Sequence, residues 1–184
     1  MSVIVTKSRP LLVRPSTEQS TPATADHVKV SSFDKALAFS AFSSFHVFDG
    51  AIHEPAETIK RALSRALDHF RLIAGRVVVG DDDGDLCIAC TGEGVEFVAA
   101  TASCALVNVK LFDPPFAGLL NDLAVDYPEA RCRVTDPLLL MQVTEFSCGA
   151  FVLRVTWNHV VADGHATSNF LVAWGRATRG LPMG

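Results

Sequence analysis

The feature that most constrains the fold is a pair of apolar segments near the C-terminus, residues 138–143 and 151–157, separated by a turn-forming sequence at 147–149. Apolar residues occupy every second position of the later segment, a spacing that places them on one face of a β-strand. Those residues are Phe151, Leu153, Val155 and Trp157. A helical spacing of apolar residues begins after Gly164. The sequence therefore predicts an antiparallel hairpin that leads directly into a helix.

Another helix is predicted at residues 55–70, where Pro55 suits the first helical turn. Its apolar stripe would cover a sheet and consists of Ile59, Leu63, Leu67 and Phe70. Shorter strand-like runs lie at 3–5, 11–13, 28–31, 77–79, 86–88 and 95–98, and the last three follow one another through turns. We therefore expect an α/β (α+β) fold, a mixed, largely antiparallel sheet covered by helices.

Three stretches are harder to interpret. Phenylalanines spaced by three between residues 39 and 48 suit a helix, whereas the alternation within 44–48 suits a strand. Residues 32–35 are expected to close the strand at 28–31. Residues 103–136 carry the weakest signal, and we expect only a short helix there, from Pro114 to Leu123.

The composition excludes several classes of protein. With 49% hydrophobic and 20% charged residues, the chain resembles a folded protein rather than a disordered one. The net charge of -4 and the absence of a basic cluster argue against nucleic acid as a partner. No apolar run approaches the roughly 20 residues that cross a bilayer, and the N-terminus lacks the apolar core of a signal peptide. We therefore expect a cytoplasmic protein that binds neither nucleic acid nor a membrane.

The five cysteines are Cys87, Cys90, Cys104, Cys132 and Cys148. An odd, scattered set without a secretory signal predicts reduced thiols. Cys87 and Cys90 form a C-x-x-C motif, but this motif lies in a strand-like run and lacks a second pair of ligands. We interpret the two residues as strand cysteines rather than as a redox or zinc site.

His159 stands at the corner between the hairpin and the last helix, four residues before Asp163. Histidine takes and returns a proton near neutral pH, so His159 is a candidate general base. If the pleat of the strand persists, its side chain shares a face with Trp157. Asp163 either caps the helix that begins at Gly164 or pairs with an arginine to hold the His159 loop. Gly164 would permit an unusual backbone angle or leave open space beside His159.

Spacing alone leaves other interpretations of this corner open. A histidine four residues before an aspartate also fits an ordinary core histidine followed by a capped helix. His159, Asp163 and His165 could bind zinc if all three converge. The chain contains no G-x-S-x-G, G-x-G-x-x-G or P-loop motif, so serine-hydrolase, dinucleotide and P-loop chemistry are not supported.

The surrounding sequence resembles a known family. Residues 158–164 are similar to the HxxxDG motif of the plant BAHD acyl-CoA-dependent acyltransferases. Residues 63–76 resemble the helix of that family that ends in PLAGR, with a departure at Arg71-Leu72-Ile73. Four further segments fit the family pattern and extend the resemblance over nearly the whole chain: 31–34, 85–98, 137–149 and 170–180.

The resemblance implies a chloramphenicol-acetyltransferase-like domain within an enzyme of about twice this length. We expect residues 1–184 to form a single domain, the N-terminal half of a two-domain acyltransferase. The family's second signature, DFGWG, is absent from this chain and belongs to the C-terminal half. That half would be a partner of this one and would supply most of the oxyanion donors.

The resemblance also implies direct transfer of an acyl group, hydroxycinnamoyl or benzoyl, from acyl-CoA to a small amine or alcohol. Acyl-CoA would be the co-substrate, with no bound cofactor and no metal. His159 would be the general base, and Asp163 and Gly164 would support its loop. His46 and Phe48 are candidates for the acceptor pocket. The competing hypothesis is a non-catalytic module that binds CoA or a partner protein through the surface that faces the C-terminal half in the family.

Overall fold

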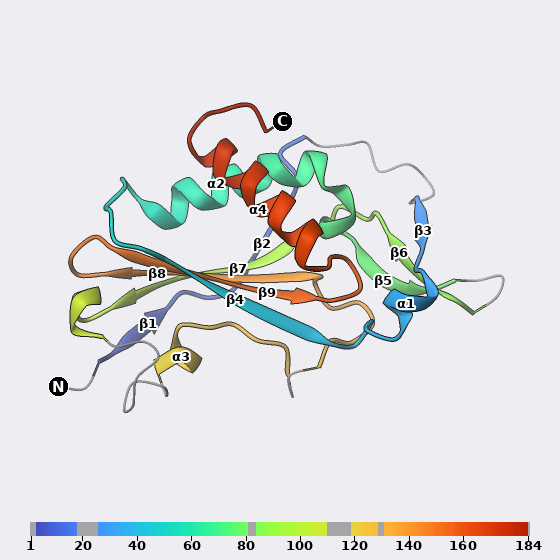
Figure 1. Cartoon of the computed structure of the whole chain (residues 1–184), viewed down its shortest axis with the longest axis horizontal. Coiled ribbons are helices and arrows are strands. Elements are labelled where there is room, and N and C mark those ends of the chain that lie inside the picture. The colour runs from blue at the N-terminus through green and yellow to red at the C-terminus, as the bar shows by residue number, and fades with distance from the viewer. Residues whose placement is uncertain (1–2, 18–25, 81–83, 110–118, 129–130, 184) are drawn as a thin grey trace.

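The computed structural model describes residues 3–17, 26–80, 84–109, 119–128 and 131–183 (Figure 1). These residues form a six-stranded sheet and a separate three-stranded sheet. Helices lie against the larger sheet (Figure 1). The mixed α/β architecture expected from the sequence is confirmed.

The larger sheet has the strand order β1–β7–β8–β9–β4, and β2 also pairs with β7. Its strands are β1 (Val5–Lys7), β2 (Leu11–Val13), β4 (Ala41–Phe48), β7 (Val95–Ala102), β8 (Leu139–Phe146) and β9 (Phe151–Asn158). All neighbours are antiparallel except β7 and β8, which are parallel. The largely antiparallel sheet was predicted, and the predicted hairpin is its β8–β9 pair, with Met141 opposite Val155.

The smaller sheet consists of β3 (His27–Lys29), β6 (Leu86–Ala89) and β5 (Arg76–Val79), in that order. The strand predicted at 95–98 does not follow β6 in the same sheet, because it is part of β7 in the larger sheet. Gly94 precedes this crossing and has a positive φ of 95°. A Cβ at Gly94 would lie 2.2 Å from the carbonyl oxygen of Val13, so only glycine allows the chain to pass this close to β2.

Two long helices cover one face of the larger sheet, which we call the front face (Figure 1). They are α2 (Pro55–His69), followed by the short helix η1 (Arg71–Ala74), and α4 (Gly164–Thr178). The predicted stripe of α2 is buried at Ile59, Leu63 and Leu67. The two helices also contact each other, since the indole N–H of Trp174 donates to the carbonyl of Ile59 at 3.2 Å. Strands and helices share one apolar core, which includes Phe97, Met141, Leu153, Trp157 and Phe170.

The opposite face of the larger sheet, the back face, is covered by α3 (Leu119–Asp122) and the chain that follows it (Figure 1). This face carries buried or nearly buried polar side chains: Gln142, Thr144, Arg154 and Thr156. Arg154, Gln142 and Thr156 donate hydrogen bonds to the main-chain carbonyls of Leu120, Asp122 and Val125, at 3.3, 2.8 and 3.1 Å respectively. The Thr144 hydroxyl accepts from the Gln142 amide at 3.0 Å. Side chains of the sheet therefore hold a segment that has little secondary structure of its own. The start of the helix predicted here, at Pro114, lies outside the described residues.

The structure resolves the ambiguous stretch at 39–48 and corrects the expectation for residues 32–35. Residues 41–48 form the edge strand β4, so the ambiguous stretch is a strand. Residues 32–35 do not close a strand but form α1 (Ser32–Lys35), because the Ser31 hydroxyl caps it by accepting from the Asp34 N–H at 3.2 Å. A single 3-10 turn, η2 (Leu106–Asn108), follows β7. None of the described helices is long and apolar enough to cross a membrane.

Candidate active site

His159 is the first residue after β9, and its backbone continues the sheet. Its N–H donates to the carbonyl of Ser40 at 2.9 Å, which extends the β4–β9 ladder one pair beyond Asn158 and Ala41. The pleat therefore persists, and the imidazole lies on the front face with Trp157. The ring packs against Phe42 of β4, with ring centroids 4.9 Å apart and an interplanar angle of 58°.

Asn158 fixes the turn that carries His159. Its side chain is buried, and its Oδ1 accepts the N–H of Val160 at 2.9 Å. Its backbone N–H donates to Leu138 at 3.0 Å, and its carbonyl accepts from Val161 at 3.3 Å. Asn158 was not predicted as a site residue. The available signal was an asparagine directly before a turn, where its amide can bond the backbone two residues on.

The imidazole of His159 is only half buried, and the two ring nitrogens differ. Nδ1 is buried and has no hydrogen-bond partner among the described residues. An unpaired buried nitrogen is unfavourable, and the indole nitrogen of Trp157 on the same face is also unpaired. Burial of Nδ1 leaves Nε2 as the nitrogen that a substrate would approach. A base that meets its substrate through Nε2 needs the proton on Nδ1 in its resting state.

Asp163 caps α4, which is one of the two roles considered for it. Its Oδ1 accepts the N–H of Ala166 at 2.8 Å. That hydrogen bond, assisted by His165 and His159, lowers the pKa of the Asp163 carboxyl below its ordinary value of 3.8. No ion pair joins Asp163 to any arginine of the described ranges. The cap fixes where α4 begins relative to His159.

Gly164 leaves space rather than adopting an unusual backbone angle. It is not among the glycines with positive φ, and a Cβ built on it would meet no atom within 4 Å. The neighbouring His165 is exposed on the first turn of α4. Across the described residues no three His, Cys, Asp or Glu side chains are arranged to hold a metal ion. The alternative zinc site of His159, Asp163 and His165 is therefore not formed.

His46 and Phe48 line a cleft of about 410 Å³ between β4 and α4, with Trp174 and Arg179 on its other side. Phe48 stacks on Phe151 with ring centroids 4.6 Å apart. His46 bonds the Ser44 hydroxyl through Nε2 at 3.0 Å, and burial lowers the pKa of its imidazole. The cleft does not include His159. Since His46 pairs with Leu153, six residues earlier in β9, the two histidines are roughly 20 Å apart along the strand.

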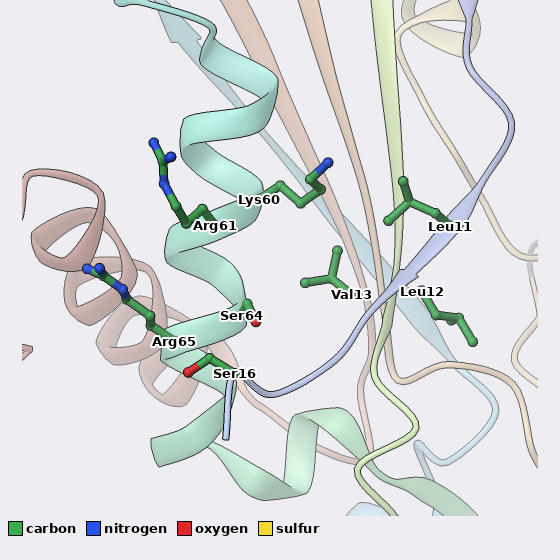
Figure 2. A pocket seen from close by; sticks show the side chains of 8 residues that line it. All are labelled: Leu11, Leu12, Val13, Ser16, Lys60, Arg61, Ser64 and Arg65. Atoms are coloured by element: carbon green, nitrogen blue, oxygen red, sulfur yellow. The ribbon is translucent and has the colours of Figure 1, made fainter. Parts of the chain in front are cut away.

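Another cleft, of about 370 Å³, lies between β2 and α2 at the opposite edge of the sheet from β4 (Figure 2). Figure 2 shows Lys60 reaching over it, while Arg61 and Arg65 project from the other side of the helix. The Lys60 ammonium already pairs with Glu57 at 2.6 Å. The cations of this cleft do not converge on one point, so it is a weaker candidate site than the His159 corner.

The chain matches known proteins over nearly its whole length. A family model described as the Transferase family matches residues 3–183. Acyl transferase 15 of rice (Oryza sativa subsp. japonica) is 41% identical over 99% of this chain and 43% of its own length. Fatty alcohol:caffeoyl-CoA acyltransferase of Arabidopsis thaliana is 36% identical over 98% of this chain and 42% of its own. Putrescine hydroxycinnamoyltransferase 3 of rice is 35% identical over 100% of this chain and 40% of its own.

The solved structure of vinorine synthase has the same fold. It matches with a TM-score of 0.75 at 25% sequence identity, over 96% of this chain and 43% of its own length. The chain thus spans less than half the length of the relatives and of the structure that it matches, and it corresponds to their N-terminal half.

Proposed function

Because this chain belongs to the Transferase family of BAHD acyltransferases, we propose that it is the N-terminal half of an enzyme that transfers an acyl group from a CoA thioester to an alcohol or amine, with His159 as general base. The observation that carries the proposal is the His159 corner itself. Its backbone is fixed by the sheet and by Asn158, its ring is half buried, and a Cβ built on Gly164 of the same loop would meet no atom within 4 Å. A general base requires a side chain that is held in place by its surroundings and a ring nitrogen that the substrate can reach.

The proposed reaction is a direct transfer. His159 Nε2 removes the proton from the acceptor's hydroxyl or amine as its oxygen or nitrogen attacks the thioester carbonyl carbon. The C–S bond then breaks, and the departing CoA sulfur receives that proton from the imidazolium. No covalent enzyme intermediate, metal or bound cofactor takes part. A general base of this kind contributes typically 10²–10⁴-fold, and alignment of the two substrates contributes further.

The relatives support a hydroxycinnamoyl donor and leave two acceptor classes. By its name, the Arabidopsis relative acts on a fatty alcohol with caffeoyl-CoA. Putrescine hydroxycinnamoyltransferase 3 of rice acts on putrescine, an amine. The cleft at His46 and Phe48 favours the alcohol over the amine. Four side chains of β4 alternate onto the front face and form a row from the His159 ring to the cleft: Phe42, Ser44, His46 and Phe48. An acceptor that reached both ends of this row would need to be long and largely apolar.

The assay that tests the base uses the chain co-expressed with the C-terminal half of rice acyl transferase 15. Donor and acceptors are caffeoyl-CoA with a long-chain alcohol or with putrescine, and the released CoA thiol is measured. We expect His159→Ala to lower kcat/KM by about 10²–10⁴-fold with the circular dichroism and Tm unchanged. The matched control His165→Ala, on the exposed first turn of α4, should stay within about twofold. Full activity of His159→Ala would disprove the base. If the unchanged chain and the His159→Ala variant both bind CoA but transfer no acyl group, the non-catalytic module would be favoured.

Phe48→Ala tests the acceptor cleft in the same assay. Loss of the ring removes apolar contact from the far end of the acceptor, so KM for the long-chain alcohol should rise about tenfold. KM for putrescine should not change, because a short acceptor at His159 does not reach Phe48. An equal change for both acceptors would contradict the placement of the acceptor pocket at His46 and Phe48.

A further inference from the structure

Two cysteines lie in neighbouring segments at the end of β9 that is opposite to His159. Cys148 is exposed in the turn between β8 and β9, and Cys104 is partly buried in the loop after β7. Cys104 packs against the apolar cluster of Ala102 and Phe146 on the back face. The acyl-transfer site proposed above uses neither thiol.

Two hydrogen bonds join the segments that carry these thiols. The backbone N–H of Ser147 donates to the carbonyl of Cys104 at 3.0 Å. The backbone N–H of Leu106 donates to the sulfur of Cys148 at 3.4 Å. Segments joined in this way lie about 5 Å apart, within the Cα separation of roughly 4.4–6.8 Å that a disulfide spans. Residues 104 and 148 thus lie in adjacent segments, and Cys148 is near enough for its charge to act on the Cys104 thiol.

The environments of the two thiols assign them different roles. The N–H groups of Leu106 and Ala150 lower the pKa of the Cys148 thiol, because they stabilise its thiolate. Burial and the neighbouring Cys148 charge raise the pKa of the Cys104 thiol. Burial also raises the pKa of Cys90, and that of Cys132 to about 11. Cys148 is therefore the exposed cysteine whose thiolate is stabilised, and Cys104 is a neighbouring thiol whose protonated form is favoured.

We propose that Cys104 and Cys148 are a peroxide-sensitive thiol pair that forms a reversible disulfide between the β8–β9 turn and the loop after β7. In the first step the Cys148 thiolate attacks one oxygen of hydrogen peroxide. The O–O bond breaks, the sulfur is oxidised to sulfenic acid, and the other oxygen leaves as water after taking a proton. In the second step the Cys104 sulfur attacks the Cys148 sulfur, the S–O bond breaks, and a second water leaves with the Cys104 proton. A dithiol reductant reverses the reaction and restores both thiols.

The disulfide would link covalently two segments that now share hydrogen bonds and apolar contacts. It closes the chain between residues 104 and 148, which includes the whole back-face segment and β8. A loop of this length restricts the unfolded chain, so the oxidised form should unfold roughly 5–10 °C above the reduced form.

The test treats the purified chain with hydrogen peroxide and maps its peptides without reduction. We expect a linked pair of peptides containing Cys104 and Cys148, lighter than the sum of the two by two hydrogen atoms, and lost after dithiothreitol. In Cys104→Ser, Cys148 should stop at sulfenic acid, which dimedone labels. In Cys148→Ser, Cys104 should remain a thiol. The matched control Cys90→Ser replaces another partly buried cysteine and should form the disulfide as the unchanged chain does.

A competing alkylation with iodoacetamide at neutral pH measures the thiolate directly, and Cys148 should react at least about tenfold faster than Cys104. Circular dichroism of each variant establishes that it is folded. Three results would overturn the proposal: sulfinic acid at Cys148 beside a free Cys104 thiol in the unchanged chain, oxidation of Cys104 at an undiminished rate in Cys148→Ser, or a link found only between two copies of the chain.

Discussion

The two faces of the six-stranded sheet are stabilised in different ways. The front face packs apolar side chains of β7, β8 and β9 against α2 and α4, and its centre is aromatic. Phe170 of α4 meets Trp157 edge to face, with ring centroids 5.4 Å apart at 88°. The back face has a smaller apolar cluster, which includes Leu123 and Phe146, and adds to it hydrogen bonds from polar side chains of β8 and β9 to the main chain of residues 120–125.

The difference shows what each covering layer needs from the sheet. A helix satisfies its own backbone, so it needs only an apolar surface to lie on. A segment without regular structure has main-chain carbonyls that must find donors when they are buried. The polar side chains of β8 and β9 provide those donors. The stability of the front face should therefore depend mainly on packing, and that of the back face on packing together with hydrogen bonds.

Trp157→Ala should have the largest effect on stability. Its side chain is fully buried, so the substitution leaves a cavity between β9 and α4 and should lower the free energy of unfolding by about 4 kcal/mol. Urea denaturation followed by circular dichroism measures this loss. Val172→Ala, at an exposed position of α4, should change it by less than about 0.5 kcal/mol.

Arg154→Met should have a smaller effect, on the back face. Arg154 pairs with Asp126 at 2.7 Å and donates to Leu120 and Ser43, and methionine keeps its length but removes these bonds. Asp126 is partly exposed and regains water, so the expected loss is about 2 kcal/mol in the same urea measurement.

The control for this change is Arg133→Met, because the Arg133 guanidinium is exposed and pairs with Asp136 at 3.4 Å, and its loss should cost less than about 0.5 kcal/mol. A loss for Arg154→Met that exceeds the loss for Trp157→Ala would show that hydrogen bonding, rather than packing, dominates the stability of this sheet.

Asp163→Asn should have the smallest effect and should depend on pH. Asparagine still caps a helix, so only the charge of the cap is lost. Folding lowers the pKa of Asp163, so its carboxylate stabilises the protein above its ordinary pKa of 3.8, and this contribution is lost as the pH falls through the lower folded value.

Thermal unfolding should therefore show a slightly lower Tm for Asp163→Asn at about pH 6 and equal values at about pH 2.5. Asp49→Asn, in the exposed loop after β4, is the control and should not show this pattern. Equal Tm values for Asp163→Asn and the unchanged chain at both pH values would mean that the cap acts through its hydrogen bond alone.

The same contrast explains how much of the fold was predictable. The front face follows from periodic apolar residues, and α2 ends within one residue of its predicted boundary. The back face depends on contacts between Arg154 and a carbonyl 34 residues earlier, which have no local pattern. For that reason residues 103–136 were hard to interpret. The sheet change at Gly94 was also missed, because the same short strand suits either sheet.

The candidate site was predictable only in part. His159 was singled out from its motif, and its place on the front face follows from the pleat that Trp157 begins. Asn158 and Phe42 were missed, since one appeared only as a turn residue and the other lay in an ambiguous stretch. His46 and Phe48 share a cleft, but spacing in the sequence gave no sign that it lies some 20 Å from His159 along the strand.

Both tryptophans of this molecule lie on the same side of the larger sheet. Its two tryptophans, Trp157 and Trp174, are both buried in the front-face core. Tryptophan fluorescence therefore reports one side of the sheet and is insensitive to the other. A partial opening that releases residues 119–128 alone would be silent in tryptophan fluorescence and visible in amide hydrogen exchange. Comparing the two signals would show whether the protein unfolds as one cooperative unit or sheds its back layer first.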